Sequence, residues 1–377
     1  MARVPPLYIH HSLRDGMRSV FSTERSDGLP PNVERFFGPC STPVDSGRSA
    51  LFAALSLLNL QKRSRIGVPV YTCSGVFDAI SAAGHVPVFL DIELEHYTVD
   101  AKSLRLKAGE LDALVAIHTF GHPIDFDTVK GIIGDIPLIE DCAHAMTAKY
   151  KGRTVGALGD AAIYSFRAGK LLGCGGGGML VSRNLGESWM SPLKRMMGRW
   201  SRRRLLMHYM QSVAGGLMSK SISALDSSDG DSGTMKIWPM APGDLNLLER
   251  RIPSLSSIVA SHRRNAADLL NALEGGSYSL PLTEQSVMHD WYLFPLRFGT
   301  EDERRRAQAR LQKAGIDAFQ LYHIALHKSR QYGYRGDCPN SEKAAKNAVM
   351  LPVHPKVSRA TIKTMRDELR LTKAGMR

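Results

Sequence analysis

The sequence lacks the features that define several large protein classes. It has five cysteines among 377 residues, and it contains no CxxC pair and no Cys/His spacing typical of a metal site. An odd number of scattered cysteines predicts free thiols in a reducing compartment and argues against a disulfide framework or a structural metal. No apolar run reaches the roughly 18 residues that a bilayer-spanning helix needs, so no such helix is expected.

The N-terminal sequence MARVPPLYIHHSLRDGM lacks the apolar core of a signal peptide, which predicts a cytoplasmic protein. There is no internal repeat and no GxxxxGK[ST] phosphate-binding motif. Acidic residues are outnumbered by basic ones, 36 to 49, which gives a net charge of +13. This excess favours an anionic partner, but charge alone does not choose among phosphate-bearing small molecules, nucleic acid and acidic membrane.

The middle of the chain predicts an open α/β layer. SGRSALFAALSLLNL, which begins at Ser46, has the apolar spacing of a buried helix. Short and nearly continuous apolar runs then alternate with helical stretches, as expected of strands buried on both faces of a largely parallel sheet. These runs are RIGVPVY, PVFLDI, ALVAIH, IPLIED, AAIYSF and GMLVS.

The length predicts one large α/β domain plus a smaller one. Residues 1–40 contain proline and glycine breaks and predict an irregular N-terminal arm, and residues 41–245 predict the large domain. Residues 246–377 predict a smaller α+β domain. Its helical start is broken near Pro253, and it contains strand-like HDWYLFPLRF and helix-like EDERRRAQARLQKAG and SRATIKTMRDELRLT.

A basic insertion at residues 186–240 stands out within the large domain. Trp189, Leu193, Met196 and Trp200 have the spacing of an amphipathic helix, and residues 186–225 hold seven Lys or Arg against one acid. One hypothesis is that residues 189–220 contact an anionic membrane surface at the inner face of the membrane. The other is that the apolar stripe packs on the protein itself. The second is favoured, because such a stripe on a surface helix normally faces the core.

Three sequence elements could carry chemistry. Asp141 ends the predicted strand IPLIED, where ligands of open α/β sheets bind, although a surface or capping role explains it as well. Lys170 precedes a glycine-rich stretch, GCGGGG, and would become nucleophilic if buried there; alone it is a weak signal. Asp45-Ser46-Gly47-Arg48-Ser49 opens a helix whose N-terminus could hold a phosphate or could simply be capped.

Together these elements resemble the sugar aminotransferases of the DegT/DnrJ/EryC1/StrS family. The matching stretches are VPVYTCSGVFDAISAAGHVPVFLDI, AIHTFGHPIDFDTV, LIEDCAHAMTAKYKGRTVGALGDAAIYSFRAGKLLGCGGGG and AVMLPVHPKVS. The resemblance covers residues 40–183 well and 244–370 more loosely. It implies a type I, aspartate aminotransferase-like α/β fold of pyridoxal 5'-phosphate (PLP) enzymes, with a large, mostly parallel-sheet domain and a smaller α+β C-terminal domain.

The resemblance implies a role for each residue that matches a family motif. Lys170, after SFxxxK, matches the Schiff-base lysine, and Asp141 matches the carboxylate that keeps the pyridine nitrogen of PLP protonated. His144 matches the residue that packs over or beside the cofactor ring. The implied phosphate-binding residues are Gly47, Arg48, Ser49 and Ser165, and the positions implied near the substrate are Tyr322 and His327 in LYHIALH.

The chain departs from the family pattern in ways that put its substrate in doubt. Cys73 stands where an aromatic residue usually stacks on the cofactor ring, and Gly175–Gly178 replaces a stretch that commonly holds a Glu. The asparagine that family members send across the dimer interface is not evident, and Asp244 or Asn246 could replace it.

The resemblance implies a ping-pong transamination from L-glutamate to a keto-sugar, usually nucleotide-linked, in cell-surface polysaccharide or amino-sugar biosynthesis. It also implies a homodimer. Transamination of a non-sugar ketone and a repurposed binding scaffold stay open as alternatives, although the intact Lys170 and Asp141 argue against a scaffold. A related dehydratase branch has His in place of the lysine, so Lys170 argues against that branch as well. No motif supports nucleic-acid binding.

Overall fold

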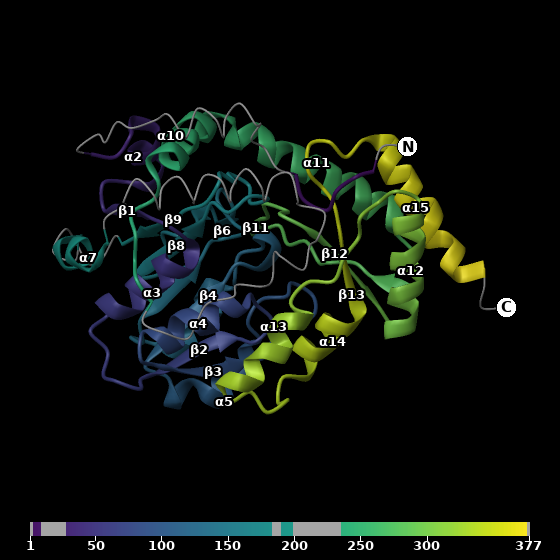
Figure 1. Ribbon diagram of the computed structural model, residues 1–377. Helices are drawn as coiled ribbons and strands as arrows, with labels where there is room; N and C mark the ends of the chain where they lie inside the picture. Colours follow the sequence, from purple (N-terminus) through teal and green to yellow (C-terminus); the bar gives the residue numbers. More distant parts are fainter. Residues whose placement is uncertain (1–2, 9–27, 183–189, 199–234, 375–377) are drawn as a thin grey trace.

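The computed structural model describes residues 3–8, 28–182, 190–198 and 235–374 (Figure 1). Its largest feature is a seven-stranded sheet with the order β1-β9-β8-β5-β4-β2-β3. Neighbouring strands from β8 to β3 pair in parallel, and β9 alone runs antiparallel to both of its neighbours. The strands are β1 (Ser41–Val44), β2 (Arg65–Pro69), β3 (Val86–Leu90), β4 (Ala113–Ile117), β5 (Leu138–Asp141), β8 (Ala161–Ser165) and β9 (Gly178–Val181).

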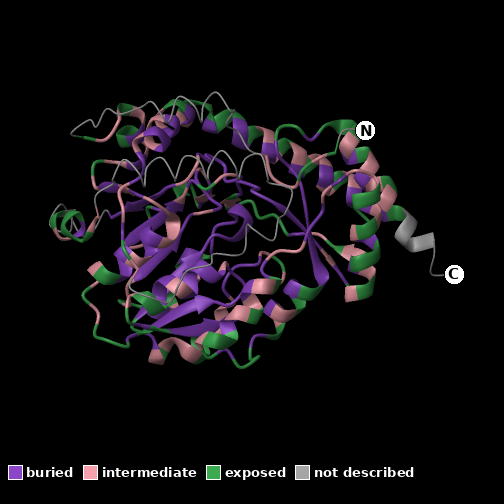
Figure 2. Cartoon of the chain, viewed as in Figure 1, coloured by how far each residue is buried: buried purple, intermediate pink, exposed green. Residues whose placement is uncertain are grey.

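Every predicted strand run of the large domain forms a strand of this sheet, which confirms the predicted α/β layer. The runs are almost wholly apolar because helices cover both faces (Figure 2). Val68 and Val115 pack with α3 (Gly47–Leu57) and α4 (Ser74–Ala82) on one face. Leu114 and Ala116, which alternate with Val115 along β4, pack with α5 (Ala101–Lys107) and α6 (Phe126–Ile133) on the other.

Short elements complete this part of the molecule. The 3₁₀ turns η1 (Ala108–Glu110) and η2 (Thr119–Gly121) flank β4. A small three-stranded sheet pairs β6 (Lys149–Tyr150) with both β7 (Arg153–Thr154) and β11 (Val287–Met288). This sheet joins a hairpin of the large domain to a segment more than a hundred residues later.

The first forty residues contain a helix where the sequence predicted an irregular arm. Helix α2 (Pro31–Phe37) begins at Pro31, a position where proline is tolerated because its missing N–H would have no helical partner. Two residues of this helix, Val33 and Phe37, are buried. Near the start of the chain, the backbone of Val4 bonds to that of Gly315 and Asp317, so this segment lies against the C-terminal part.

Most of the basic insertion, including Trp189 and residues 199–220 with Trp200, lies outside the described residues. Its described part holds α7 (Met190–Met196), in which Leu193 is fully buried in the core that α3 and α4 share. Met196 is 40% exposed. The predicted helix is therefore confirmed over these seven residues, and Leu193 behaves as the packing hypothesis expects.

The C-terminal part builds a second, antiparallel sheet of β10 (Tyr278–Ser279), β12 (Phe294–Phe298) and β13 (Ala348–Leu351). The predicted break near Pro253 is confirmed, because η4 (Ile252–Ser254) separates α10 (Pro242–Arg251) from α11 (Leu255–Leu273). The remaining helices are α12 (Glu301–Lys313), α13 (His323–Lys328), η5 (Ser329–Tyr332), α14 (Pro339–Asn347) and α15 (Arg359–Ala374). Helix α11 joins two hydrophobic cores. Its Leu255 packs in a core shared with the large sheet, and its Leu269 packs in the core of the C-terminal sheet. The boundary at residue 246 thus stays a prediction.

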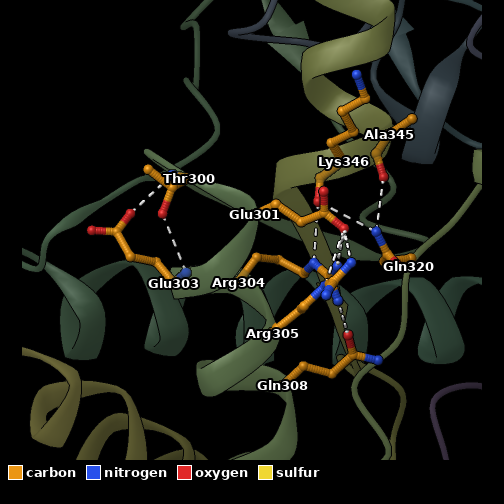
Figure 3. Close-up of polar contacts among 9 residues, drawn as sticks. All are labelled: Thr300, Glu301, Glu303, Arg304, Arg305, Gln308, Gln320, Ala345 and Lys346. Carbon is orange, nitrogen blue, oxygen red and sulfur yellow. Dashed lines mark hydrogen bonds and ion pairs between the residues drawn. The ribbon is translucent and has the colours of Figure 1, made fainter.

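Side-chain hydrogen bonds fix the start of α12 against the rest of the C-terminal part (Figure 3). Thr300 and Glu303 form a capping box, in which each side chain accepts a hydrogen bond from the backbone N–H of the other residue. The buried Arg304 donates to the carbonyl of Lys346 at 3.1 Å and to Gln308 Oε1 at 2.6 Å. The bond to Lys346 ties α12 to the end of α14.

Candidate active site

A cavity of about 350 Å³ opens beyond the carboxyl ends of β2, β5 and β8. This is the edge at which parallel sheets present ligand-binding residues. Most of the predicted site residues line it: Gly47, Arg48, Asp141, His144, Ser165, Lys170 and Tyr322. Two predicted residues do not. Ser49 is buried behind the cavity, and His327 is exposed on α13, outside the cavity lining of this chain.

One end of the cavity is formed by the N-terminus of α3. Ser46 caps this helix and accepts a hydrogen bond from the N–H of Ser49 at 3.1 Å, while the two hydroxyl oxygens lie 2.9 Å apart. Ser49 therefore supports the turn. At Gly47 a Cβ atom would lie 2.9 Å from Ser165 Cβ, so glycine lets the end of β8 lie directly against the helix. The first helical turn offers N–H groups that lack helical partners, which suits an anion there.

Lys170 lies deep in the cavity, in the loop between β8 and β9, and is 8% exposed. Burial, reinforced by the nearby charge of Arg167 and opposed by Asp141, lowers the pKa of its amine to about 7. Its Nζ lies 4.9 Å from the ring centre of Tyr292. The loop itself is anchored, because the buried Arg251 donates hydrogen bonds to the carbonyls of Gly173 and Leu171.

Asp141 ends β5 and is 6% exposed. Its Oδ1 accepts a hydrogen bond from the N–H of Ala143 at 2.9 Å. Burial raises the pKa of this carboxyl, although the Ala143 bond and the charges of Lys170 and His118 oppose the change. Asp141 and Lys170 line the same cavity and form no ion pair with each other.

His144 is held in one orientation between aromatic side chains. Its Nδ1 accepts a hydrogen bond from the N–H of Phe120 at 3.2 Å, and its ring stacks on Tyr292 with centroids 4.4 Å apart. Burial first, and then the charges of Lys170 and Arg167, hold the pKa of this imidazole well below its usual range. The neutral ring therefore carries its proton on Nε2, which lies 3.4 Å from the hydroxyl of Tyr322.

A buried carboxylate on β5 holds the loop that precedes β8. Glu140 accepts hydrogen bonds from His118 Nε2 at 3.0 Å and from the N–H groups of Gly156, Leu158 and Gly159, each at 2.7 Å. His118 Nδ1 in turn accepts from the N–H of Ile124. Glu140, His118 and Cys142 come close enough to hold a metal, but the carboxylate and imidazole are already engaged. This cluster is structural support for the cavity wall.

A second buried carboxylate connects the His144 loop to the C-terminal part. Asp290 Oδ2 accepts hydrogen bonds from the N–H groups of Met146 and Thr147, at 2.6 and 2.7 Å. Its Oδ1 accepts from the Thr147 hydroxyl at 2.6 Å and from Arg263 at 2.9 Å. Asp290 thus fixes the chain two residues beyond His144.

Several residues of the cavity were not identified from the sequence. Tyr292 and Arg167 line it, and so does Phe319. Arg167 had a local signal, because it lies inside the SFxxxK motif. Tyr292 had none, since only the fold brings it to Lys170. Cys73, the departure noted in the sequence, also lines the cavity, whereas neither of the candidate replacements for the missing asparagine, Asp244 and Asn246, does so.

Comparisons with known proteins identify a family and several relatives. The model of the DegT/DnrJ/EryC1/StrS aminotransferase family matches residues 39–214 and 246–370. A dTDP-3-amino-3,4,6-trideoxy-alpha-D-glucose transaminase of Streptomyces venezuelae is 28% identical over 359 residues, which cover 91% of this chain and 87% of the relative. A UDP-N-acetyl-3-dehydro-alpha-D-glucosamine 3-aminotransferase of Acidithiobacillus ferrooxidans is 25% identical over 336 residues, covering 88% and 83%. The crystal structure of S. venezuelae DesV with a ketimine intermediate superposes with a TM-score of 0.77 at 25% identity, covering 100% of both chains.

Proposed function

Because this chain belongs to the DegT/DnrJ/EryC1/StrS aminotransferase family, we propose that it moves an amino group from L-glutamate to a nucleotide-linked keto-sugar. One observation carries the proposal: a single cavity is lined by a buried amine of lowered pKa, a buried carboxylate, and a helix N-terminus with a serine beside it. This is the set of groups that an aldehyde, a ring nitrogen and a phosphate on one cofactor would need.

The cavity residues fit PLP. Asp141 is a buried carboxylate whose Oδ2 accepts no hydrogen bond from any residue in the described ranges, and a protonated pyridine nitrogen would supply the missing donor. The absence of a Cβ at Gly47 keeps Ser165 against the N-terminus of α3, where a phosphate would lie. We propose that Lys170 would hold the aldehyde carbon, Asp141 the ring nitrogen, and Gly47, Arg48 and Ser165 the phosphate.

The protein's own residues would then perform three tasks. When bound, PLP supplies an electron sink that allows an amine and a carbonyl to exchange nitrogen and oxygen. With a pKa of about 7, the Lys170 amine is neutral in about half of the molecules at pH 7. It would accept the proton that leaves the α-carbon of the donor and later release it. Asp141 retains its charge once it faces a cation. His144 and Tyr292 form a buried aromatic wall that excludes water from the reacting atoms.

The relatives support the substrate class. The names of the two curated relatives specify a dTDP-linked and a UDP-linked amino-sugar, so the proposal names nucleotide-linked keto-sugars as a class. The product would serve cell-surface polysaccharide or amino-sugar biosynthesis. The excess of basic residues, 49 against 36, suits a substrate that carries a diphosphate.

The same proposal includes a cytoplasmic location and a homodimer. Analytical ultracentrifugation, which measures the mass of the assembly in solution, tests the homodimer. None of the helices in the described part of the chain combines the length and apolar character that a bilayer crossing needs. Membrane contact by residues 189–220 is tested by co-sedimentation with anionic liposomes. If the protein shows no salt-sensitive binding to these liposomes, the proposal that it lies at the membrane surface is refuted.

The deciding experiment measures release of 2-oxoglutarate from L-glutamate in the presence of dTDP-, UDP- and GDP-linked keto-sugars, with simple ketones as the comparison. We expect turnover with a nucleotide-linked keto-sugar and none with the Lys170→Ala variant. The purified protein should also absorb visible light, and that absorbance should be lost in the variant. A protein that neither binds PLP nor releases 2-oxoglutarate would refute the proposal.

A further inference from the structure

Arg167 is a cation of the cavity that has no carboxylate partner. At the proposed phosphate end of the cavity, Nη1 of Arg48 lies 3.5 Å from Oδ2 of Asp78. The other cation of the cavity, Lys170, is assigned to the cofactor. The guanidinium of Arg167 forms no ion pair or hydrogen bond with any residue in the described part of the chain. Arg167 is a solvent-exposed residue that also lines the cavity, so it lies at the rim of the cavity.

The position of Arg167 points to the place where nitrogen is exchanged. It stands between Ser165 and Lys170 in the loop after β8. Its charge acts on the Lys170 amine, on His144 and on the hydroxyl of Tyr292, which together surround the inner part of the cavity. A guanidinium stays charged at all relevant pH values, and its planar fork of N–H donors matches the two oxygens of a carboxylate.

We propose that Arg167 binds the α-carboxylate of the amino donor and thereby selects an amino acid for the first half-reaction. This inference rests on the proposed function. In an amino acid the carboxylate is attached to the same carbon as the amine, so an amine that reaches the Lys170 position brings its carboxylate with it. The diphosphate of a nucleotide-linked acceptor is separated from the keto carbon by part of the sugar ring, which places it farther from Lys170.

The first half-reaction can be measured without any sugar. The holoenzyme is mixed with L-glutamate, and the loss of the visible absorbance of the bound cofactor is followed in a single turnover. The same measurement is made with 4-aminobutyrate, which is glutamate without its α-carboxylate. The ratio of the two apparent second-order rate constants isolates the contribution of the carboxylate, because effects of Arg167 on Lys170 are common to both amines.

In Arg167→Gln we expect the preference for glutamate over 4-aminobutyrate to fall by roughly tenfold or more, as expected when a charge-assisted hydrogen-bonded pair is lost. Arg167→Lys should restore part of this preference, since the charge remains and the fork does not. Arg105→Gln, an exposed arginine on α5 outside the cavity lining, is the matched control and should leave the ratio unchanged. Retention of the cofactor absorbance after dialysis shows that each variant is folded.

An unchanged ratio in Arg167→Gln would overturn the assignment while leaving the proposed function intact. Weaker inhibition of Arg167→Gln by UDP or dTDP, with the glutamate preference unaltered, would overturn it in favour of a diphosphate contact. A wild-type holoenzyme whose absorbance responds to no amino acid would overturn the proposed function, and the role of Arg167 with it.

Discussion

Capture of PLP by the cofactor-free protein should depend on pH with a midpoint near 7. Only a neutral amine attacks an aldehyde, and burial lowers the pKa of the Lys170 amine from 10.5 to about 7. At pH 7 about half of the molecules would carry the neutral amine, against roughly one in 3,000 for an ordinary lysine. The capture rate should therefore rise about tenfold per pH unit in the acid range and level off above neutrality.

The assay is stopped-flow absorbance after mixing PLP with the cofactor-free protein, in buffers between about pH 5.5 and 9. Nα-acetyl-lysine in the same buffers is the control, because its amine is solvated and its rate should keep rising throughout. Two variants should shift the midpoint in opposite directions. Arg167→Gln removes a positive charge and raises the midpoint, whereas Asp141→Asn removes a negative one and lowers it. A protein rate that parallels Nα-acetyl-lysine, or two shifts of the same sign, would refute the electrostatic account.

Further predictions concern stability and cofactor retention. Cofactor-free Lys170→Met should be more stable than wild type at pH 7 by about 2–4 kcal/mol in urea unfolding, because a buried ammonium is costly. Since the folded pKa lies below the unfolded one, the wild-type protein gains stability from pH 7 toward 10.5, and the difference should narrow across that window. Asp290→Asn should lower the free energy of unfolding by about 2–3 kcal/mol, since this fully buried carboxylate accepts four hydrogen bonds; a loss under about 1 kcal/mol would contradict its role. Gly47→Ala should weaken PLP retention in equilibrium dialysis by about tenfold through displacement of Ser165, whereas Gly131→Ala, in open space on α6, should not.

The predicted strands of the large sheet could be identified because each buried run carries its signal within five to seven residues. Lys170 and Asp141 were identified for a different reason, since they lie in long stretches that resemble a family motif. Helix α2 was missed because Pro31 and Gly38 suggested irregular chain, although proline is compatible with the first turn of a helix. Its seven residues are stabilised chiefly by burial of Val33 and Phe37, which a local pattern does not reveal.

Tyr292 shows why the rest of the site could not be predicted. It lies 122 positions after Lys170 in the sequence, and its ring reaches that amine because the C-terminal part packs against η2, where the N–H of Tyr292 donates to the carbonyl of Phe120. Asp290 contributes to this packing, because it hydrogen-bonds the loop that follows His144. Both residues lie in the strand-like run HDWYLFPLRF, but nothing in that run indicates a role at the site, because their roles depend on tertiary contacts.

The division of labour between His144 and Lys170 follows from their surroundings. His144 accepts a hydrogen bond on Nδ1 from the backbone, and burial beside two cations keeps its pKa well below the usual range, so it stays neutral and cannot exchange a proton near pH 7. The Lys170 amine lies in the same cavity, and its pKa of about 7 makes it half protonated there. A group that must both take and return a proton works best when its pKa matches the working pH. These surroundings support the proposed role of Lys170 as the proton carrier, and they support for His144 the proposed role of a neutral ring surface stacked on Tyr292.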